Sequence, residues 1–296
     1  MKAVLAAMVL VGSASVAEGQ QDTVRIQTVP VASGVYMLVG QGGNIGVSVG
    51  EDGVFLVDDQ FAPLTGRIIA AVKAISGQPI RFLLNTHWHG DHTGGNENFG
   101  KAGVIIVAHD NVRQRMSVEQ FIARFNSRTP PAPKPALPVV TFNDAATFHL
   151  NGEDIHAVHV KNAHTDGDVL VHWQKANVIH MGDTFFNGSY PFIDLSTGGS
   201  INGVIDATAA GLAFVDEQTR IIPGHGPISA KADLVAYRDM LVAVRDNVKK
   251  LIAERKPLAE VLAAKPSATF DAKWGNGFMK ADDFVTTVFE SLTAKK

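Results

Sequence analysis

Cysteine is missing from the sequence altogether. The chain therefore forms no disulfide, even if it is exported, and offers no thiolate to a metal ion. Attachment of a lipid to a processed N-terminal cysteine is excluded for the same reason. Any metal ion must be held by other side chains, such as histidine and aspartate.

A large excess of positive charge is also missing. The chain has 26 lysines and arginines against 29 aspartates and glutamates, which leaves a formal net charge of −3. A nucleic-acid-binding protein needs a basic surface that displaces counterions from the phosphate backbone. The sequence therefore predicts a small-molecule substrate and no nucleic-acid partner, and leaves the oligomeric state open.

An apolar run long enough to cross a membrane is absent from the N-terminal segment. The run at residues 3–11 ends at Gly12, whereas a membrane-spanning helix needs ~20 apolar residues. Lys2 precedes the run, and the small residues Ser15 and Ala17 follow it, as in a cleaved signal peptide. We predict a signal peptide at residues 1–17 and a periplasmic or secreted protein without a membrane anchor after cleavage; an uncleaved anchor is the alternative.

The first part of the mature chain is predicted to form antiparallel strands, because short apolar segments alternate with glycine-rich turns. These strands span residues 24–28, 35–39, 45–49 and 54–57. An amphipathic helix and two buried strands follow at residues 64–75, 81–85 and 104–107. A helix between two strands is typical of parallel pairing, with the helix packed outside the sheet.

The second part repeats this order after a proline-rich stretch at residues 113–141, which we interpret as a long surface loop and not as a domain linker. Further strands are predicted at residues 147–150, 155–160, 169–173 and 178–181. A helical extension is expected at about 229–296, with Ser229 as N-cap, an end at Pro257 and a final helix around 284–292. We therefore predict one domain over residues 22–296.

The segment Thr86-His87-Trp88-His89-Gly90-Asp91-His92 directly follows the strand predicted at 81–85. Two imidazoles separated by one residue on an extended segment can converge on one ion, and the adjacent Asp91 and His92 can point to a second. Neutral imidazole and carboxylate suit zinc, which needs only three such protein ligands and a water molecule. The sequence therefore predicts a metal site here, and a histidine-rich turn without a role is the alternative.

Three further candidate ligands follow other predicted strands: His164, Asp183 and His225. Each lies in a loop, where side chains from several strands can reach a shared cleft. Neighbouring glycines permit tight turns beside them. We expect these residues to join the histidine-rich segment in one site.

In this order, the candidate ligands resemble the pattern of the metallo-β-lactamase superfamily: His-x-His-x-Asp-His, then His, Asp and His. The resemblance implies an α/β fold, a four-layer αβ/βα sandwich with extra C-terminal helices, and two zinc ions at one edge. It implies that the first ion is held by His87, His89 and His164. It implies that the second is held by Asp91, His92 and His225, with Asp183 bridging both.

This resemblance implies hydrolysis in which a hydroxide shared by two zinc ions ~3.5–4 Å apart attacks a carbonyl. Asp91 is the predicted catalytic residue, because it would both ligate and orient the nucleophile and pass a proton to the leaving atom. Asp58 resembles a family aspartate near the metal ions, although a simple turn role fits equally. Phe185, Phe186 and Tyr190 are candidates for substrate contact.

The substrate has several possible identities. Residues 164–173 look like the corresponding stretch of class B β-lactamases, which favours β-lactamase-like amide or ester hydrolysis. Asp183 and Phe186 stand where the most similar subclass has cysteine and lysine. Residues 182–186 are similar to glyoxalase-II-like thioesterases, so a lactonase or thioesterase is the alternative. A non-catalytic zinc-binding module is a third possibility.

Overall fold

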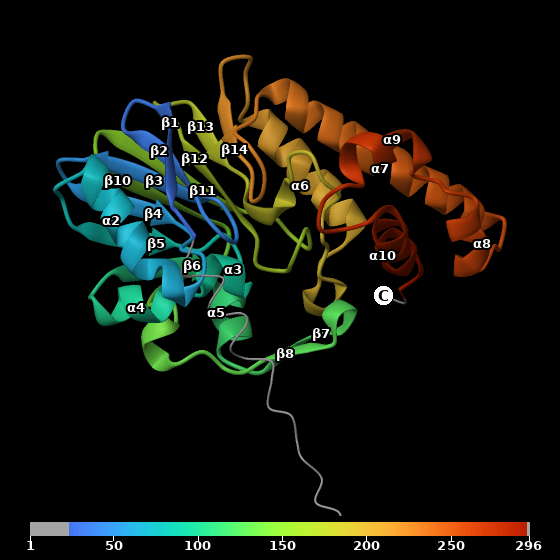
Figure 1. The fold of residues 1–296 in the computed structure, drawn as a ribbon, viewed down its shortest axis with the longest axis horizontal. Coiled ribbons are helices and arrows are strands. Elements are labelled where there is room, and N and C mark those ends of the chain that lie inside the picture. Colours follow the sequence, from blue (N-terminus) through green and yellow to red (C-terminus); the bar gives the residue numbers. More distant parts are fainter. Residues whose placement is uncertain (1–23, 295–296) are drawn as a thin grey trace, which may run out of the picture.

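The computed structural model describes residues 24–294. The predicted signal peptide and the predicted boundary at residue 22 lie outside these residues. Two β-sheets face each other, and helices cover their outer faces (Figure 1). No helix within the described residues is both long enough and apolar enough to span a membrane.

The first sheet has the strand order β1-β2-β3-β4-β5-β6-β9. Its strands are β1 Gln27–Ala32, β2 Val35–Val39, β3 Ile45–Gly50, β4 Gly53–Val57, β5 Ile80–Leu84, β6 Ile105–His109 and β9 Val140–Phe142. Strands β1 to β4 pair antiparallel, as predicted for the first part of the chain. Strands β4, β5, β6 and β9 pair parallel with one another in this order. The carboxyl ends of the parallel strands therefore meet at one edge.

The second sheet has the order β10-β11-β12-β13-β14. Its strands are β10 Ala145–Leu150, β11 Glu153–His159, β12 Val169–Trp173, β13 Val178–His180 and β14 Arg220–Ile222. Pairing is antiparallel except between β13 and β14. The short strand β14 was not predicted from the sequence.

Side-chain alternation along the central strands explains why the sheets pack face to face. In β4, Phe55 and Val57 point toward the second sheet, whereas Val54 and Leu56 point toward the helices outside. Every residue of β4 is buried because both faces are covered. A strand buried on both faces is continuously apolar instead of alternating with polar residues.

Helices form the two outer layers and complete a four-layer αβ/βα sandwich, which confirms the predicted fold. Those that follow the first-sheet strands are α2 Thr65–Ile75, α3 Gly90–Thr93, α4 Asn96–Lys101 and α5 Asp110–Met116. Those that follow the second-sheet strands are α6 Ile201–Ala213, α7 Lys231–Ala253, α8 Leu258–Ala263, α9 Ala268–Trp274 and α10 Ala281–Thr293. Short 3₁₀ turns are η1 Ala62–Leu64, η2 Ala123–Phe125, η3 Lys134–Ala136, η4 Gly182–Thr184 and η5 Leu195–Thr197.

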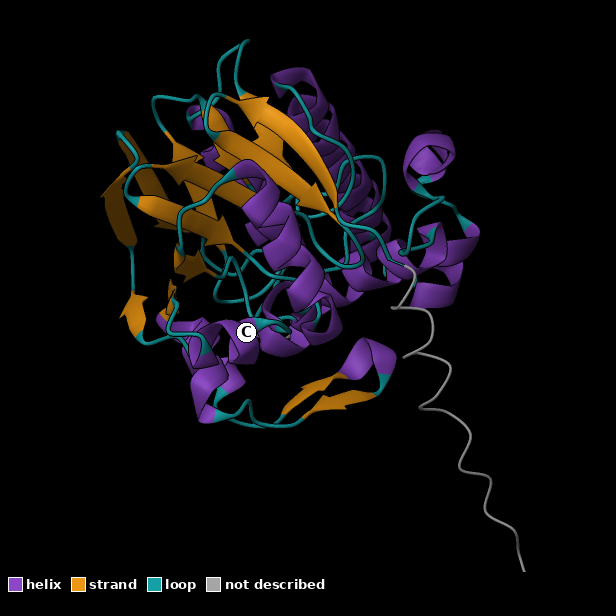
Figure 2. Cartoon of the chain, turned by 60° about the vertical axis from the view of Figure 1, so that its left-hand side comes forward, coloured by secondary structure: helices purple, strands orange, loops and turns teal. Residues whose placement is uncertain are grey.

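Further details differ from the predictions. The first strand was predicted at residues 24–28 but lies at Gln27–Ala32. The proline-rich stretch is not one long loop: it contains the end of α5, a hairpin of β7 Gln120–Ile122 and β8 Ser127–Thr129, and the edge strand β9. Figure 2 shows this hairpin set apart from the two large sheets. Ser229 does not cap α7, because its hydroxyl accepts from Asn187 and donates to Pro227; Ala230 is the N-cap.

Candidate metal centre

The predicted ligands follow the ends of strands that meet at one edge of the sandwich. The histidine-rich segment comes directly after β5, and the short helix α3 presents Asp91 and His92. Asp183 follows β13 in η4, and His225 follows β14. Because β13 and β14 run parallel, their carboxyl ends place Asp183 and His225 close together. The side chains at this edge therefore lie close together in space, although they are far apart in the sequence.

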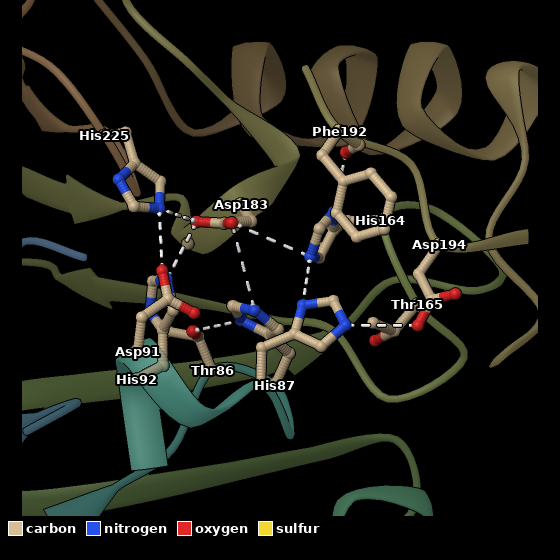
Figure 3. A network of polar contacts seen from close by, with 12 residues as sticks. Thr86, His87, Asp91, His92, His164, Thr165, Asp183, Phe192, Asp194 and His225 are labelled. Atoms are coloured by element: carbon tan, nitrogen blue, oxygen red, sulfur yellow. Dashed lines mark hydrogen bonds and ion pairs between the residues drawn. The ribbon is translucent and has the colours of Figure 1, made fainter. Parts of the chain in front are cut away.

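All seven predicted ligands come together in space (Figure 3). Their donor atoms form three groups in which all atoms lie within 4.8 Å of one another. The groups are His87, His89 and His164; His87, His92 and Asp183; and Asp91, His92 and His225. The first and third groups are the two triads that the family resemblance implied.

Asp183 lies between the two triads, with one carboxylate oxygen on each side. Its Oδ2 is 3.9 Å from His87 Nε2 and 3.6 Å from His164 Nε2. Its Oδ1 is 3.0 Å from His92 Nε2 and 3.4 Å from His225 Nε2. One carboxylate therefore contacts both halves of the cluster.

Asp58 orients one half of the cluster. Its carboxylate lies 2.7 Å from His92 Nδ1 and accepts hydrogen bonds from the backbone N–H and the hydroxyl of Thr86. Asp58 therefore fixes the His92 ring and leaves Nε2 directed into the cluster. A partner on the second ring nitrogen is the usual device that orients a metal-binding histidine.

Asp194 and the Phe192 carbonyl orient the other half, and the sequence did not identify either. Asp194 Oδ2 is 3.1 Å from His89 Nε2, so Nδ1 of His89 faces the cluster. His164 Nδ1 donates to the carbonyl oxygen of Phe192 at 2.8 Å. Asp194 also accepts from the backbone of Ser196 as the N-cap of η5. A capping signal alone would have marked a turn and not a partner for His89.

We expect Asp194→Ala to weaken zinc binding by about 10–100-fold, because the His89 ring loses the acceptor that holds it. Zinc titration against a competing chelator would measure this change. Asp216→Ala is the matched control, since Asp216 also accepts from backbone N–H groups of a turn but lies outside the cluster. Equal zinc affinities for the two variants would contradict a positioning role for Asp194.

The buried carboxylates and imidazoles of the cluster shift one another's pKa values. Burial alone would lower the pKa of His92, but carboxylates, chiefly those of Asp183 and Asp91, raise it well above its usual value. Against the effect of burial, Asp183 also raises the pKa of His225 to about 9. Burial would raise the pKa of Asp91, yet His92 and His225 lower it to about 2. The carboxylates thus require positive charge beside them.

The imidazoles of His87 and His164 are neutral because their pKa values are lowered. Burial, with a smaller contribution from His92, lowers the pKa of His87 well below its usual value. Burial lowers the pKa of His164 to about 4. Neutral imidazoles have a free lone pair and are the form that binds a metal ion.

The donor set fits zinc. His87 Nε2, His92 Nε2 and Asp183 Oδ1 are buried without a hydrogen-bond partner. His92 Nε2 and Asp183 Oδ1 approach to 3.0 Å, but without the geometry of a hydrogen bond. Buried polar atoms without partners are rare and require an explanation. Nitrogen and oxygen atoms that converge here, next to carboxylates that require positive charge, match the ligands that zinc prefers.

Gly224 lets the backbone approach Asp183 closely. A Cβ atom at Gly224 would lie 2.1 Å from Asp183 Oδ1 and 2.6 Å from the carbonyl of Gly182. Contacts this short force the neighbours to move. Glycine at position 224 therefore helps to define the position of the central carboxylate.

We expect Gly224→Ala to lower activity by about 10²-fold, because a displacement of about 1 Å at reacting groups has an effect of this size. Metal content measured beside the steady-state rate would show whether the displaced Asp183 also loses an ion. The control is Gly66→Ala on α2, where an added Cβ meets nothing within 4 Å. Activity in Gly224→Ala equal to that of the control would overturn this assignment.

Comparison with known families decides the classification. A family model described as the metallo-beta-lactamase superfamily matches residues 38–260. The chain belongs to the metallo-beta-lactamase superfamily. The match covers the strands from β3 to β14 and every member of the cluster.

Curated members of the superfamily that the chain resembles include two hydroxyacylglutathione hydrolases. The enzyme of Nitrosococcus oceani is 26% identical over 215 residues, which are 70% of this chain and 68% of the relative. The enzyme of Erythrobacter litoralis is 24% identical over 37% of this chain and only 36% of its own length. The sequence similarity to this relative thus spans about a third of it.

Solved structures of the superfamily share the fold at lower identity. A metallo-beta-lactamase from Pontibacter korlensis is 19% identical, with a TM-score of 0.59 over 73% of this chain and 99% of that one. An inverting sec-alkylsulfatase from Pseudomonas sp. is 14% identical, with a TM-score of 0.68 over 93% of this chain and 51% of that one. The shared fold thus extends over nearly all of the chain.

Of the three aromatic residues predicted from the sequence to contact substrate, one borders the cluster. Phe185 is fully buried, and Tyr190 is buried with its hydroxyl bonded to Asp271, so neither contacts substrate in this arrangement. Phe186 stacks on the ring of His225 at 5.1 Å and does border the cluster.

Proposed function

We propose that the chain is a binuclear zinc hydrolase that cleaves ester or thioester bonds of small substrates. The observation that carries the proposal is the position of Asp183, whose two oxygens face two separate histidine groups. The hydroxyacylglutathione hydrolases named above support the thioester class, because a hydroxyacylglutathione is a thioester. The ester part of this proposal belongs to the amide or ester hydrolysis that the sequence favoured, and the thioester part belongs to the lactonase or thioesterase alternative.

The proposed ligands are those that the family resemblance implied. His87, His89 and His164 would hold one zinc ion, and Asp183 would contact both. Asp91, His92 and His225 would hold the other. Bound zinc would supply Lewis-acid polarisation and lower the pKa of a water molecule to about 7.

Asp91 would be the catalytic carboxylate. Its side chain is 28% exposed, whereas that of Asp183 is only 6% exposed, so Asp91 is the carboxylate that substrate can reach. Its Oδ2 lies 3.3 Å from His225 Nε2 and 3.6 Å from His92 Nε2, which keeps it ionised. As a carboxylate it would accept a hydrogen bond from the attacking water and transfer the proton to the leaving oxygen or sulfur.

The surroundings of His225 favour ester or thioester over β-lactam. Phe186 occupies the position where the similar β-lactamases carry lysine, and its ring covers His225. The ion pairs of the cluster join histidines to aspartates. These ion pairs therefore contain no lysine or arginine that could bind the carboxylate of a β-lactam. Hydrolysis of β-lactams, which the sequence favoured, stays a prediction, and turnover of a cephalosporin would test it.

The test uses the full zinc-loaded chain with p-nitrophenyl acetate, S-lactoylglutathione and a chromogenic cephalosporin. We expect turnover of the ester or the thioester that disappears with a chelator and returns with zinc. Protein with two bound zinc ions per chain and no turnover of either would contradict the proposal. Turnover of the cephalosporin alone would favour the β-lactamase alternative.

Asp91→Ala separates an enzyme from a non-catalytic zinc-binding module. If the chain is an enzyme, this variant loses turnover and the cellular function together. A module would keep its cellular function after the substitution, with zinc still bound. Metal content of the variant must therefore be measured in the same preparation.

We also propose that the enzyme acts outside the cytoplasm, on the basis of the charged start, the apolar run and the small residues Ser15 and Ala17. Expression in a Gram-negative host, fractionation and N-terminal sequencing would test this. We expect processed protein in the periplasm. An intact N-terminus in the cytoplasm or the membrane would contradict the proposal.

A further inference from the structure

Three phenylalanine rings extend outward from the metal centre. The Phe192 ring lies 5.7 Å from the ring of His89 and 5.6 Å from that of His164. Figure 3 shows the Phe192 ring beside His164. Phe125 lies 4.8 Å from Phe192, and Phe278 lies 5.4 Å from Phe125. We call Phe192, Phe125 and Phe278 the aromatic track. It joins the metal ligands to the protein surface without a break.

Exposure rises along the aromatic track. Phe192 is 8% exposed, Phe125 42% and Phe278 72%. Exposure of large aromatic side chains to this extent is unfavourable, because their apolar surface contacts water. The aromatic track is buried where it meets His89 and His164 and exposed at its far end, which is the form expected of an entry path for an apolar group.

The aromatic track is built from three segments that are far apart in the sequence and tied together. Phe125 lies in η2 between β7 and β8, where neighbouring Arg124 forms an ion pair with Asp283 of α10. The Ala123 backbone N–H donates to the Ser196 hydroxyl at 3.1 Å. These contacts fix the hairpin over the loop that carries Phe192.

Phe278 comes from the C-terminal extension. It lies between α9 and α10, and the neighbouring Met279 pairs with Tyr190 through a β-bridge. The extension is thus connected to the loop that holds Phe192, whose carbonyl oxygen orients His164. The C-terminal helices therefore contribute to the approach to the metal centre as well as to the core.

A cavity of about 260 Å³ adjoins the aromatic track and shares Phe192 and Asp194 with the metal centre. Its charged lining consists of Arg124, Asp194 and Glu290. Asp283 compensates Arg124, so this lining does not favour an anion. Phe192, Ile193 and Leu195 give the cavity an apolar side, and the aromatic track continues outward from Phe192. An uncharged apolar group fits this side of the cavity.

We infer that the aromatic track binds the apolar acyl chain of an uncharged ester or thioester substrate and selects for its length. This inference rests on the proposed function. Each methylene that leaves water on an apolar surface contributes to binding, by about four-fold when fully buried and about two-fold when half-buried. The aromatic track is partly exposed, so the smaller factor applies.

The test measures kcat/KM of the zinc-loaded full chain for p-nitrophenyl esters from acetate to octanoate. We expect octanoate to exceed acetate by roughly 50-fold. In the Phe125→Ala/Phe278→Ala double variant this ratio should fall by at least about ten-fold. Phe121→Ala is the matched control and should keep the ratio, because Phe121 is 40% exposed on the same hairpin but packs under Arg128.

Binding of the uncharged fluorophore N-phenyl-1-naphthylamine gives a readout that does not depend on turnover. We expect the double variant to bind it more weakly and Phe121→Ala to bind it as the wild type does. If neither the esters nor S-lactoylglutathione are hydrolysed but the fluorophore shows this pattern, the proposed function fails, whereas the aromatic track is still shown to bind an apolar group.

Two results would overturn the inference while leaving the proposed function intact. One is hydrolysis of acetate with no dependence on chain length. The other is a chain-length ratio that the double variant retains. Conversion of a dimer to a monomer by Phe278→Ala, together with either result, would assign the aromatic track to contact with a second copy.

Discussion

Asp183→Asn is expected to lower kcat/KM by about 10³-fold and to reduce the zinc content of the protein. Asparagine keeps the shape of the side chain but removes the charge between the two histidine groups, and its amide hydrogens point toward one of them. Charge stabilisation by a metal centre is worth several kcal/mol, and each 1.36 kcal/mol changes a rate tenfold. Steady-state kinetics and metal analysis of one preparation would measure both effects.

Asp206→Asn is the matched control for this substitution, because Asp206 is exposed on α6 and outside the cluster. It should keep wild-type activity and zinc content. An Asp183→Asn protein that binds two zinc ions and retains wild-type turnover would show that the central carboxylate is not needed, and the role proposed here for Asp183 would fail.

Trp173→Ala should lower the free energy of unfolding by about 3–5 kcal/mol, the range for removing a large buried aromatic side chain. Trp173 is fully buried at the end of β12, between the two sheets. A Cβ atom at Gly46 would lie 2.9 Å from its ring, so the opposite strand makes room for it. Its Nε1 has no hydrogen-bond partner, so the loss would be one of packing.

Denaturant unfolding of the zinc-loaded protein would measure this loss as a lower midpoint at an unchanged slope. Phe121→Ala is again the control, because an exposed aromatic ring contributes little to stability. Trp173→Phe should recover part of the loss by refilling the space. A change below about 1 kcal/mol in Trp173→Ala would mean that the sheets close over the vacated volume.

The strand and helix pattern was largely predictable because the sheets are buried on defined faces. The apolar positions of β2, β3 and β4 lie where the sequence placed them, since each must contact either the second sheet or the outer helices. The hairpin of β7 and β8 was missed because prolines and exposed residues surround it. Its position depends on contacts with η5 and α10, which local sequence does not encode.

Sequence by itself determined the chemistry of the centre: histidines and aspartates, no cysteine, and a spacing that matches one superfamily. Only the tertiary structure decided which nitrogen of each ring faces inward, and that Asp194 and the Phe192 carbonyl fix His89 and His164. It also decided that Asp183 contacts both triads. The reason is physical: donor type is a property of one residue, whereas distances between loops that follow different strands are set by the packing of the whole sandwich.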